Sequence, residues 1–374
     1  MPKISISFVV ICRDEERTIK RCLNAIEKNI EEYDEIIVID TGSQDKTLDI
    51  IYSNFTNVKI FNFKWENDFS AARNYGIKKA KKDWIFFIDA DETLQKDCGY
   101  KVRNDINQAK KITNDFLVLV PKIINENSVV TYNTGRIIPN NFHLSYFGLV
   151  HEYPIIDRDM NNKDYDEVVL PDIVLRHDGY KTEVVNKKDK PRRNSLLDKK
   201  MLEILPNSIR YNYFYYHDGR TLLGSQEYVN GLKKTFCLNK KDRFAKVAIC
   251  ELIVFYIKQG KYNLADYYIN EVSKYLDEND QHDLKWQLAY ISAVNEFEKL
   301  QQQELKLLQT LKAIKINHKN DLDKIFEKGM NYDELMGFIN LSLGNIEEAN
   351  KICDYLKKNN FSSELKKSIK KYKS

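Results

Sequence analysis

Apolar residues in the first ninety positions gather into short uninterrupted runs, each followed by a stretch with apolar residues at helical spacing. The runs are ISISFVVI, EIIVID, VKIFNF and DWIFFIDA, and segments such as DEERTIKRCLNAIEKN and FSAARNYGIKKAKK lie between them. A continuous apolar run of this length is typical of a strand buried on both faces, as in a parallel sheet. The alternation therefore predicts an α/β domain with a doubly wound, largely parallel sheet.

The pattern changes twice along the chain. From Asp115, FLVLVPKII and SVVTYNTGRII are expected to form strands paired through the polar turn NENS, and SYFGLVHEYP and EVVLPDIVLRHDGY continue this mixed section. From Pro191 the spacing is helical to the last residue. A chain of 374 residues is too long for one ordinary core. We therefore expect an α/β domain over residues 1–190 and an all-α domain over residues 191–374.

A weak repeat runs through the helical part. Gly224, Gly260 and Gly344 each lie between two amphipathic stretches, and VAICELIVFYIKQGKYNLADYYINEVSKYL shows the helix–turn–helix pattern best. Units of about 34 residues with this pattern are typical of tetratricopeptide repeats, which stack into a solenoid with a concave binding face. The wide step from Gly260 to Gly344 predicts a degenerate or enlarged middle unit. A plain helical bundle is the alternative.

Composition excludes several classes of protein. The 59 basic and 55 acidic residues give a net charge of only +4, so no nucleic-acid partner is indicated. The six cysteines form no C-x-x-C pair, which fits a reduced, cytoplasmic setting. The chain opens on a strand followed by RDEER rather than on a signal peptide. No apolar stretch approaches the roughly 20 residues of a transmembrane helix.

Acidic residues stand at the ends of the predicted strands. Asp40 ends the second strand, and Asp89 and Asp91 follow the fourth strand in WIFFIDADE. Ligands of open α/β sheets bind outside the carboxyl ends of the strands, and paired carboxylates suit a hard divalent cation. The alternative for Asp89 and Asp91 is a solvated acidic turn, and for Asp40 it is helix capping.

Other residues add to a phosphate or sugar site. Arg73 is expected in the first turn of a helix capped by Ser70, where a helix N-terminus and a guanidinium would both attract phosphate. A surface salt bridge is the alternative. The chain has no G-x-G-x-x-G motif after the first strand and no Walker-type loop, so a bound pyrophosphate would need a cation to neutralise it.

A carboxylate and a histidine complete the candidate chemistry. Glu152, in VHEYP, is suited to act as a general base on an acceptor hydroxyl or thiol. His177, in LRHDGY, can complete the ligand set of a cation. A lone histidine more often has a structural role, but the acid pair and the nearby carboxylate favour the ligand role here. Pro154 follows His151-Glu152 closely, which excludes the helix that a zinc protease motif needs.

Together these motifs resemble family 2 glycosyltransferases with the GT-A fold. The resemblance runs from about Ile4 to Tyr180 and is carried by SFVVICRDEERTIKRCL, EIIVIDTGSQDKTLDI, DFSAARNYGIKKAKKDWIFFIDADE and VHEYP. The later helices resemble the tetratricopeptide-like tail of one branch of that family. Within this branch, the combination with His-x-Gly-Tyr looks like the peptide S-glycosyltransferases that modify bacteriocins of the glycocin or sublancin type.

The resemblance implies an α/β nucleotide-sugar domain with a Rossmann-like mixed sheet, and inverting transfer from a UDP-sugar with Mg²⁺ or Mn²⁺. It makes Asp91 the principal metal ligand, with Asp89 near the ribose or sugar and His177 as the third ligand. Glu152 takes the place of the catalytic base. The remaining donor-binding positions are Cys12, Asp40, Arg73, Ala90 and Arg136. Cys12-Arg13 departs from the residues frequent at the end of the first strand in this family.

Three hypotheses concern the acceptor and the role of the helical part. We expect a peptide acceptor, a bacteriocin precursor modified on Cys or Ser, bound by the helical part or by a homodimer formed through it. One alternative is an enzyme that extends a surface polysaccharide or lipopolysaccharide. A second is a scaffold with an inactive transferase domain, which the intact acid pair, Glu152 and His177 argue against.

Overall fold

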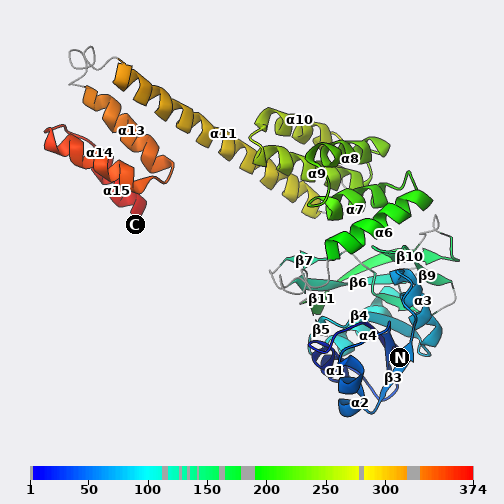
Figure 1. The fold of residues 1–374 in the computed structure, drawn as a ribbon. Coiled ribbons are helices and arrows are strands. Elements are labelled where there is room, and N and C mark those ends of the chain that lie inside the picture. Colours follow the sequence, from blue (N-terminus) through cyan, green and yellow to red (C-terminus); the bar gives the residue numbers. More distant parts are fainter. Residues whose placement is uncertain are drawn as a thin grey trace. The chain divides into compact units, whose positions relative to one another are not determined.

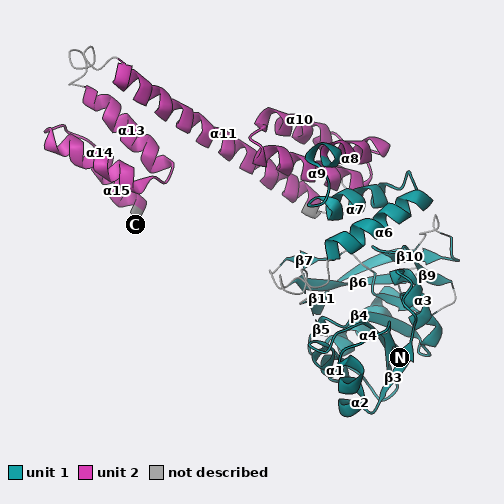
Figure 2. Ribbon diagram, in the orientation of Figure 1, with its two compact units in different colours: residues 1–228 teal, residues 229–374 magenta. Residues whose placement is uncertain are grey.

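The computed structural model describes residues 3–111, 117–125, 129–132, 135–140, 143–159, 165–177, 190–277, 282–317 and 329–373. The chain divides into two compact units, residues 1–228 and residues 229–374 (Figure 2). Each unit is described by itself below. Among the described helices, none is both long and apolar enough to cross a membrane.

The first unit is built on one large mixed sheet (Figure 1). Its strand order is β3-β2-β1-β4-β8-β6-β11-β5, with β7 paired to β6. The bounds are β1 Ile6–Cys12, β2 Glu35–Asp40, β3 Val58–Asn62, β4 Trp84–Asp89, β5 Glu92–Leu94, β6 Leu117–Asn125, β7 Val130–Thr131, β8 Ile137–Pro139 and β11 Asp166–His177. Strands β1 to β4 are mutually parallel, whereas β8 and β5 pair antiparallel with their neighbours. The expected α/β domain with a mixed sheet is therefore confirmed.

Helices cover both faces of the parallel half. On one face, α1 (Ile19–Glu27), α2 (Thr47–Asn54) and α4 (Cys98–Ala109) bury apolar side chains against β1, β2 and β4 in one cluster. On the other face, α3 (Phe69–Lys79) packs with a second cluster that includes Val9, Ile39 and Phe87. Burial on both faces explains why these strands are continuous apolar runs rather than alternating ones.

A short hairpin lies beside the second cluster. Strands β9 (Leu144–Phe147) and β10 (Tyr153–Ile156) pair antiparallel in a separate two-stranded sheet. Leu144, Tyr146 and Ile156 pack into the cluster on the α3 side of the large sheet. The hairpin loop carries His151 and Glu152, so this packing brings the expected base to the large sheet.

The first unit continues into the helical part of the chain. Helix α6 (Lys190–Ile204) packs on α7 (Ile209–Gly219), and both lie before the division between Tyr228 and Val229. The expected start of the helical region at Pro191 agrees with α6 to within one residue. The division into functional domains at residue 190 stays a prediction, because α6 and α7 belong to the same compact unit as the sheet.

The second unit is entirely helical in its described residues. Its helices are α9 Arg243–Lys258, α10 Tyr262–Ser273, α11 His282–Asn317, α13 Met330–Ser342, α14 Ile346–Lys358 and α15 Leu365–Lys373, and α8 (Ser225–Leu238) crosses the division from the first unit. The pairs α9–α10 and α13–α14 are packed helix–turn–helix units. The expected helical C-terminal region is confirmed.

Two of the three repeat glycines stand where a helix pair turns. Gly260 has φ +67° between α9 and α10, and Gly344 has φ +79° between α13 and α14, a conformation that a Cβ disfavours. Gly224 precedes α8 without a positive φ. The wide step from Gly260 to Gly344 contains α11, a 36-residue helix that contacts α9, α10 and α13. One long helix is thus part of the expected enlarged middle unit.

Candidate active site

Three strand ends meet at one edge of the parallel half-sheet. Cys12 is in register with Asp40, and Ile11 with Asp89, so β1, β2 and β4 end side by side. Asp40 is buried, and its carboxylate accepts the backbone N–H groups of Gly42 and Ser43 at 3.1–3.2 Å. These bonds hold the loop after β2. They do not make Asp40 a helix cap, the alternative role, because α2 (Thr47–Asn54) begins after Lys46 as its N-cap. The Cys12 thiol lies 3.7 Å from the Asp40 carboxylate. Contact of either residue with a nucleoside stays a prediction.

Arg73 connects the strand edge to the hairpin loop. Its Nε donates to Glu152 Oε1 at 2.6 Å, and its Nη2 lies 3.4 Å from Asp89 Oδ1. The guanidinium also lies 5.3 Å from the ring centre of Phe87 and 5.6 Å from that of Tyr146. These cation–π contacts and the two carboxylates fix one orientation of a buried charge.

The expected helix start around Arg73 is wrong by two residues. The N-cap of α3 is Asp68, whose carboxylate accepts the N–H of Ala71 at 2.9 Å, and Ser70 lies inside the first turn. Asp68 is the stronger cap because a carboxylate also complements the positive end of the helix dipole. Arg73 therefore lies in the second turn, and the helix N-terminus does not reinforce its charge. Its Nη1 is buried with no hydrogen-bond partner among the described residues.

Asp89 stands between two arginines. Arg136, just before β8, donates from Nη2 to Asp89 Oδ2 at 2.8 Å and to Glu92 Oε1 at 3.2 Å. Both guanidinium groups are buried, whereas the Asp89 side chain is 35% exposed. Asp89 is thus the member of this network that faces outward. Ala90, between the two expected acids, is buried in the core cluster on the face covered by α1, α2 and α4.

Asp91 meets His177 on the other side of Ala90. Pairing of β5 with β11 sets His177 opposite Glu92, and His177 Nε2 lies 3.3 Å from Asp91 Oδ2. His177 Nδ1 lies 3.0 Å from the side-chain oxygen of Asn125, whose Nδ2 donates to the carbonyl of Val129. The Asn125 oxygen must then accept from Nδ1, so Nε2 is the nitrogen directed at Asp91.

The carboxylates in this region carry shifted pKa values. Burial alone would raise the pKa of Glu152, but the adjacent charge and hydrogen bond of Arg73 outweigh it and lower the pKa. Burial is likewise outweighed at Asp89, where Arg136 and Arg73 lower the pKa. At Glu92 burial prevails and raises the pKa to about 7. Glu152 is therefore an ionised, weak base at neutral pH.

The donor set at Asp91 fits a divalent cation. Burial would raise the pKa of Asp91, but its hydrogen bond with His177 and the nearby Lys190 lower it, so the carboxylate is ionised. A carboxylate oxygen and an imidazole nitrogen 3.3 Å apart are suitable neighbouring ligands for Mn²⁺ or Mg²⁺. Asp89 differs, because its oxygens contact Arg73 and Arg136. The structure thus brings Asp91 and His177 together and turns Asp89 toward the arginines.

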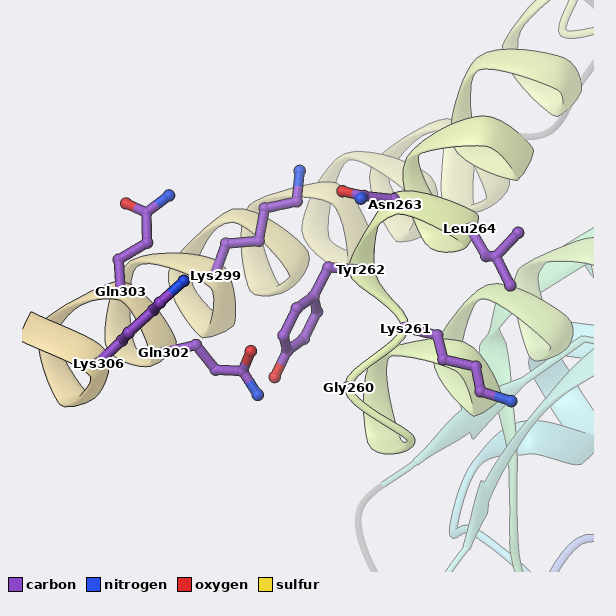
Figure 3. A pocket seen from close by; sticks show the side chains of 9 residues that line it. All are labelled: Gly260, Lys261, Tyr262, Asn263, Leu264, Lys299, Gln302, Gln303 and Lys306. Atoms are coloured by element: carbon purple, nitrogen blue, oxygen red, sulfur yellow. The ribbon is translucent and has the colours of Figure 1, made fainter. Parts of the chain in front are cut away.

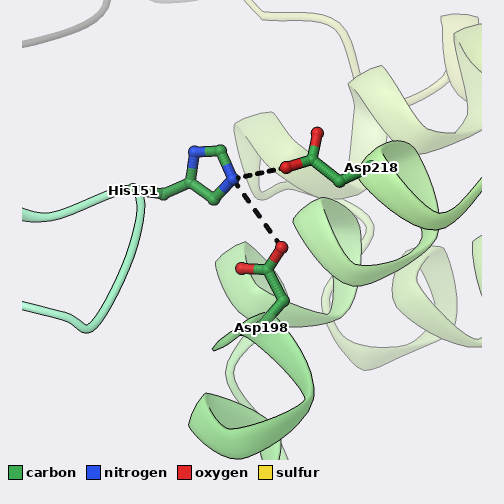
Figure 4. A group of neighbouring side chains, drawn as sticks. All are labelled: His151, Asp198 and Asp218. Carbon is green, nitrogen blue, oxygen red and sulfur yellow. Dashed lines mark hydrogen bonds and ion pairs between the residues drawn. The ribbon is translucent and has the colours of Figure 1, made fainter. Parts of the chain in front are cut away.

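A second group of possible ligands lies on the far side of the hairpin loop. His151, next to Glu152, contacts Asp198 of α6 and Asp218 of α7 (Figure 4). One ligand atom of each residue lies within 4.8 Å of the other two. This His–Asp–Asp group was not expected from the sequence, because its members come from a loop and two helices that are distant along the chain.

Glu92 and Arg210 also hold this site, although the sequence did not predict their roles. Glu92 is buried and accepts the backbone N–H of Asp89 at 2.8 Å, which holds the strand end. Arg210 of α7 donates to the carbonyl of His151 at 2.8 and 3.2 Å. Glu92 could have been found as the third acid of WIFFIDADE. Asn125 and Arg210 carry no signal in the sequence, since neither stands in a recognisable motif.

The second unit contains a hollow of about 650 Å³ between α10 and α11 (Figure 3). Its polar lining includes Lys261, Lys299 and Lys306, together with Tyr262 and Gln302. Lys299 is paired with Asp266 and Glu296. No histidine or carboxylate is among the described residues that line it, so the hollow offers mainly lysine, tyrosine and amide groups for binding.

The Arg73–Glu152 pair yields a test by double-mutant cycle. Arg73→Met leaves two buried or half-buried carboxylates without their shared cation, which should cost about 3–5 kcal/mol of unfolding free energy. In a Glu152→Gln background the same change should cost less, by about 1 kcal/mol or more, because one of the two carboxylates is already neutral. Urea unfolding of the four proteins measures both values. Equal costs in the two backgrounds would show that the pair is not coupled.

Comparison with known proteins indicates the family of the first part of the chain. Residues 7–168 match the model of the family Glycosyl transferase family 2. The chain is 32% identical over 259 residues to the SPbeta prophage-derived glycosyltransferase SunS of Bacillus subtilis, covering 67% of this chain and 59% of that protein. It is 32% identical over 180 residues to a TPR repeat-containing protein of Synechococcus elongatus, covering 47% of this chain and 42% of that protein. The chain thus spans less than two thirds of the length of these relatives.

A solved structure is also similar at low identity. The crystal structure of Staphylococcus aureus TarS 1-349 in complex with UDP-GlcNAc is 17% identical, with a TM-score of 0.43 over 71% of this chain and 89% of that one. The family match spans the strands and helices that carry Arg73, Asp89, Asp91 and Glu152. The chain therefore carries a domain of the Glycosyl transferase family 2 over residues 7–168.

Proposed function

We propose that this protein transfers a sugar from a UDP-sugar to a Cys or Ser side chain of a peptide, with inversion at the anomeric carbon. The observation that carries the proposal is the position of the Arg73 guanidinium between two carboxylates. Its Nε donates to Glu152 Oε1 at 2.6 Å, and its Nη2 lies 3.4 Å from Asp89 Oδ1. One buried cation thus joins a candidate base to the strand edge where α/β folds bind ligands. The family match over residues 7–168 supports the reaction class.

The donor would bind at the ends of β1, β2 and β4. Asp40 and Cys12 are suited to contact the nucleoside, and Asp89, the outward member of the arginine network, to contact the ribose or sugar. Asp91 and His177 would hold Mg²⁺ or Mn²⁺. A cation held there supplies positive charge that offsets the negative charge of the diphosphate. Arg73 and Arg136 add two buried positive charges at the same edge.

Glu152 would take the proton of the acceptor. Its Oε1 is held by Arg73, and its second oxygen is suited to accept the proton as the acceptor attacks the anomeric carbon. The carbon–oxygen bond to UDP breaks as the new bond forms, and UDP leaves with its electron pair. Because one carboxylate serves as base and no second carboxylate is needed as nucleophile, a single displacement with inversion follows.

The lowered pKa of Glu152 favours a thiol acceptor. A model carboxyl has a pKa of about 4.3 and a thiol about 8.5, so even proton transfer from a thiol to an unshifted Glu costs at least about 5 kcal/mol before bond formation assists it. A serine hydroxyl is a far weaker acid than a thiol and would need more help. The resemblance of the motifs to peptide S-glycosyltransferases supports the same acceptor class.

The second unit would contribute to acceptor binding. Paired helices form extended surfaces in repeat proteins, and the hollow between α10 and α11 offers lysine, tyrosine and glutamine side chains to a peptide. A homodimer formed through these helices stays a prediction. Extension of a surface glycan is the alternative function, and it would appear as transfer to an oligosaccharide with none to any Cys or Ser peptide.

Donor chemistry is tested through Asp91 and His177. With a Cys peptide, a UDP-sugar and Mn²⁺, intact mass should show sugar addition by the full chain and little or none by Asp91→Asn. His177→Ala should weaken Mn²⁺-dependent UDP binding, measured calorimetrically, more than it lowers the melting temperature without metal. Full activity in excess chelator, or in Asp91→Asn, would contradict the metal role of this pair.

The base is tested by comparing two acceptors. Glu152→Gln should lower kcat/KM for a Ser peptide about 100-fold or more, the usual value of a general base, and lower it less for the matched Cys peptide. The remaining Cys transfer should rise about tenfold per pH unit below the thiol pKa, because the thiolate then forms without the base. An equal loss for both peptides, with no change in pH profile, would argue against Glu152 as the base.

The acceptor role of the second unit is tested by charge reversal. Lys261→Glu with Lys306→Glu, both exposed and lining the hollow, should raise KM for the peptide at least several-fold and leave slow hydrolysis of the UDP-sugar unchanged. Lys312→Glu with Lys366→Glu is the matched control, since both lysines are exposed and outside the hollow. If both pairs changed peptide KM equally, the hollow would have no specific role.

A further inference from the structure

The His–Asp–Asp group of His151, Asp198 and Asp218 is not used by the proposed reaction (Figure 4). His151 Nε2 lies 3.0 Å from Asp218 Oδ2 and 3.7 Å from Asp198 Oδ2. Ligand atoms in a tetrahedral zinc site lie about 3.3 Å apart, since each metal bond is about 2.0–2.1 Å long. The three side chains thus converge at the spacing of a metal site.

Asp198 is the most deeply buried member of the group, and its side-chain oxygens make no hydrogen bond among the described residues. It lies within α6 with 0% of its surface exposed. Buried carboxylates in proteins are almost always paired, because an isolated buried charge is very costly. The Arg210 guanidinium donates to the carbonyl of His151, and that of Arg193 donates to Asn194. Neither arginine hydrogen-bonds Asp198.

The imidazole is held in place from several sides. The ring of His151 stacks on Phe214 at 3.7 Å with an interplanar angle of 8°. His151 has φ +52°, and Gly148, at the start of the loop, has φ +119°. A left-handed backbone at a non-glycine residue is unfavourable, so surrounding contacts must maintain it. The Arg210 bonds to the His151 carbonyl provide part of that support.

We propose that His151, Asp198 and Asp218 bind a structural divalent metal ion, with Zn²⁺ as the best match. Burial and the neighbouring Asp218 raise the pKa of Asp198 to about 9, so a bound divalent ion would replace the proton of this carboxyl and neutralise the two carboxylates. Zn²⁺ accepts both nitrogen and oxygen ligands and leaves a fourth position for water. The ion joins the hairpin loop to α6 and α7, next to Glu152 in the chain. Its occupancy is independent of the proposed function, whereas its effect on the base rests on that function.

The ion differs from the donor-site cation in its requirements. The ligands of the proposed site are all protein side chains, so binding needs no UDP. Asp91 and His177 form a separate pair: Asp91 lies just after β4, and His177 is the last residue of β11. Removal of the structural ion should loosen the loop, so turnover should fall while UDP affinity is retained. Loss of the structural ion should thus lower turnover only, whereas loss of the donor-site cation should also weaken UDP binding. The two outcomes are therefore distinguishable.

The test uses the full chain without UDP, stripped with EDTA and titrated with Zn²⁺. The wild type should bind one equivalent of Zn²⁺ at the His–Asp–Asp group, and its melting temperature should rise. Asp198→Asn should weaken that binding about 100-fold or more, because loss of a direct ligand exceeds the 10–100-fold effect of losing an outer-shell partner. Asp91→Asn is the control and should keep the same equivalent. Co²⁺ substitution should give a four-coordinate visible spectrum in wild type and not in Asp198→Asn.

Two results would overturn the proposal. One is equal Zn²⁺ binding and equal thermal gain in wild type and Asp198→Asn. The other is loss of Zn²⁺ binding in Asp91→Asn but not in Asp198→Asn, which would place the ion at the donor site. Should Asp198→Asn fail to fold, Asp218→Asn replaces it, because the Asp218 side chain is already 15% exposed and tolerates the change more readily. Absence of any Zn²⁺ binding by the wild type would also overturn it.

Discussion

The contact between Arg73 and Glu152 is the constraint on which the candidate site depends. The two residues are 79 positions apart, and they meet only because α3 lies on one face of the sheet and the β9–β10 hairpin packs beside it. A buried guanidinium requires carboxylate partners, and a buried carboxylate requires a cation. Each residue thus makes the burial of the other tolerable. The same guanidinium reaches Asp89, which ties the loop to the end of the central strand.

The interaction also limits the chemistry. A carboxylate held by a guanidinium stays ionised and is oriented, but its basicity is reduced. Such a group assists acceptors that are already acidic and serves poorly for weak acids. In the proposed reaction the site would therefore combine positive charge near the donor, from Arg73, Arg136 and a cation at Asp91 and His177, with a mild base near the acceptor. This asymmetry is the physical reason for proposing a thiol acceptor.

Much of the parallel half-sheet was predictable from sequence, because strands buried on both faces leave long apolar runs such as WIFFID and EIIVID. The acids at their ends were predictable for the same reason, since they interrupt those runs. Tertiary pairing was not predictable in the same way. The antiparallel strands β8 and β5 are three residues each, too short to show a period. The cap of α3 was misplaced because Asp68 and Ser70 are both good caps.

The helices after the sheet show the same limit. Their amphipathic pattern identified them, but the packing of α6 and α7 within the first unit depends on residues such as Asp198 and Arg210 that form no motif. The proposed reaction is a single displacement assisted by one carboxylate. NMR determination of the anomeric configuration of the product, made from an α-linked UDP-sugar and a Cys peptide, tests this most directly. A β-linked product is predicted, and an α-linked product would contradict the single displacement with Glu152 as its base.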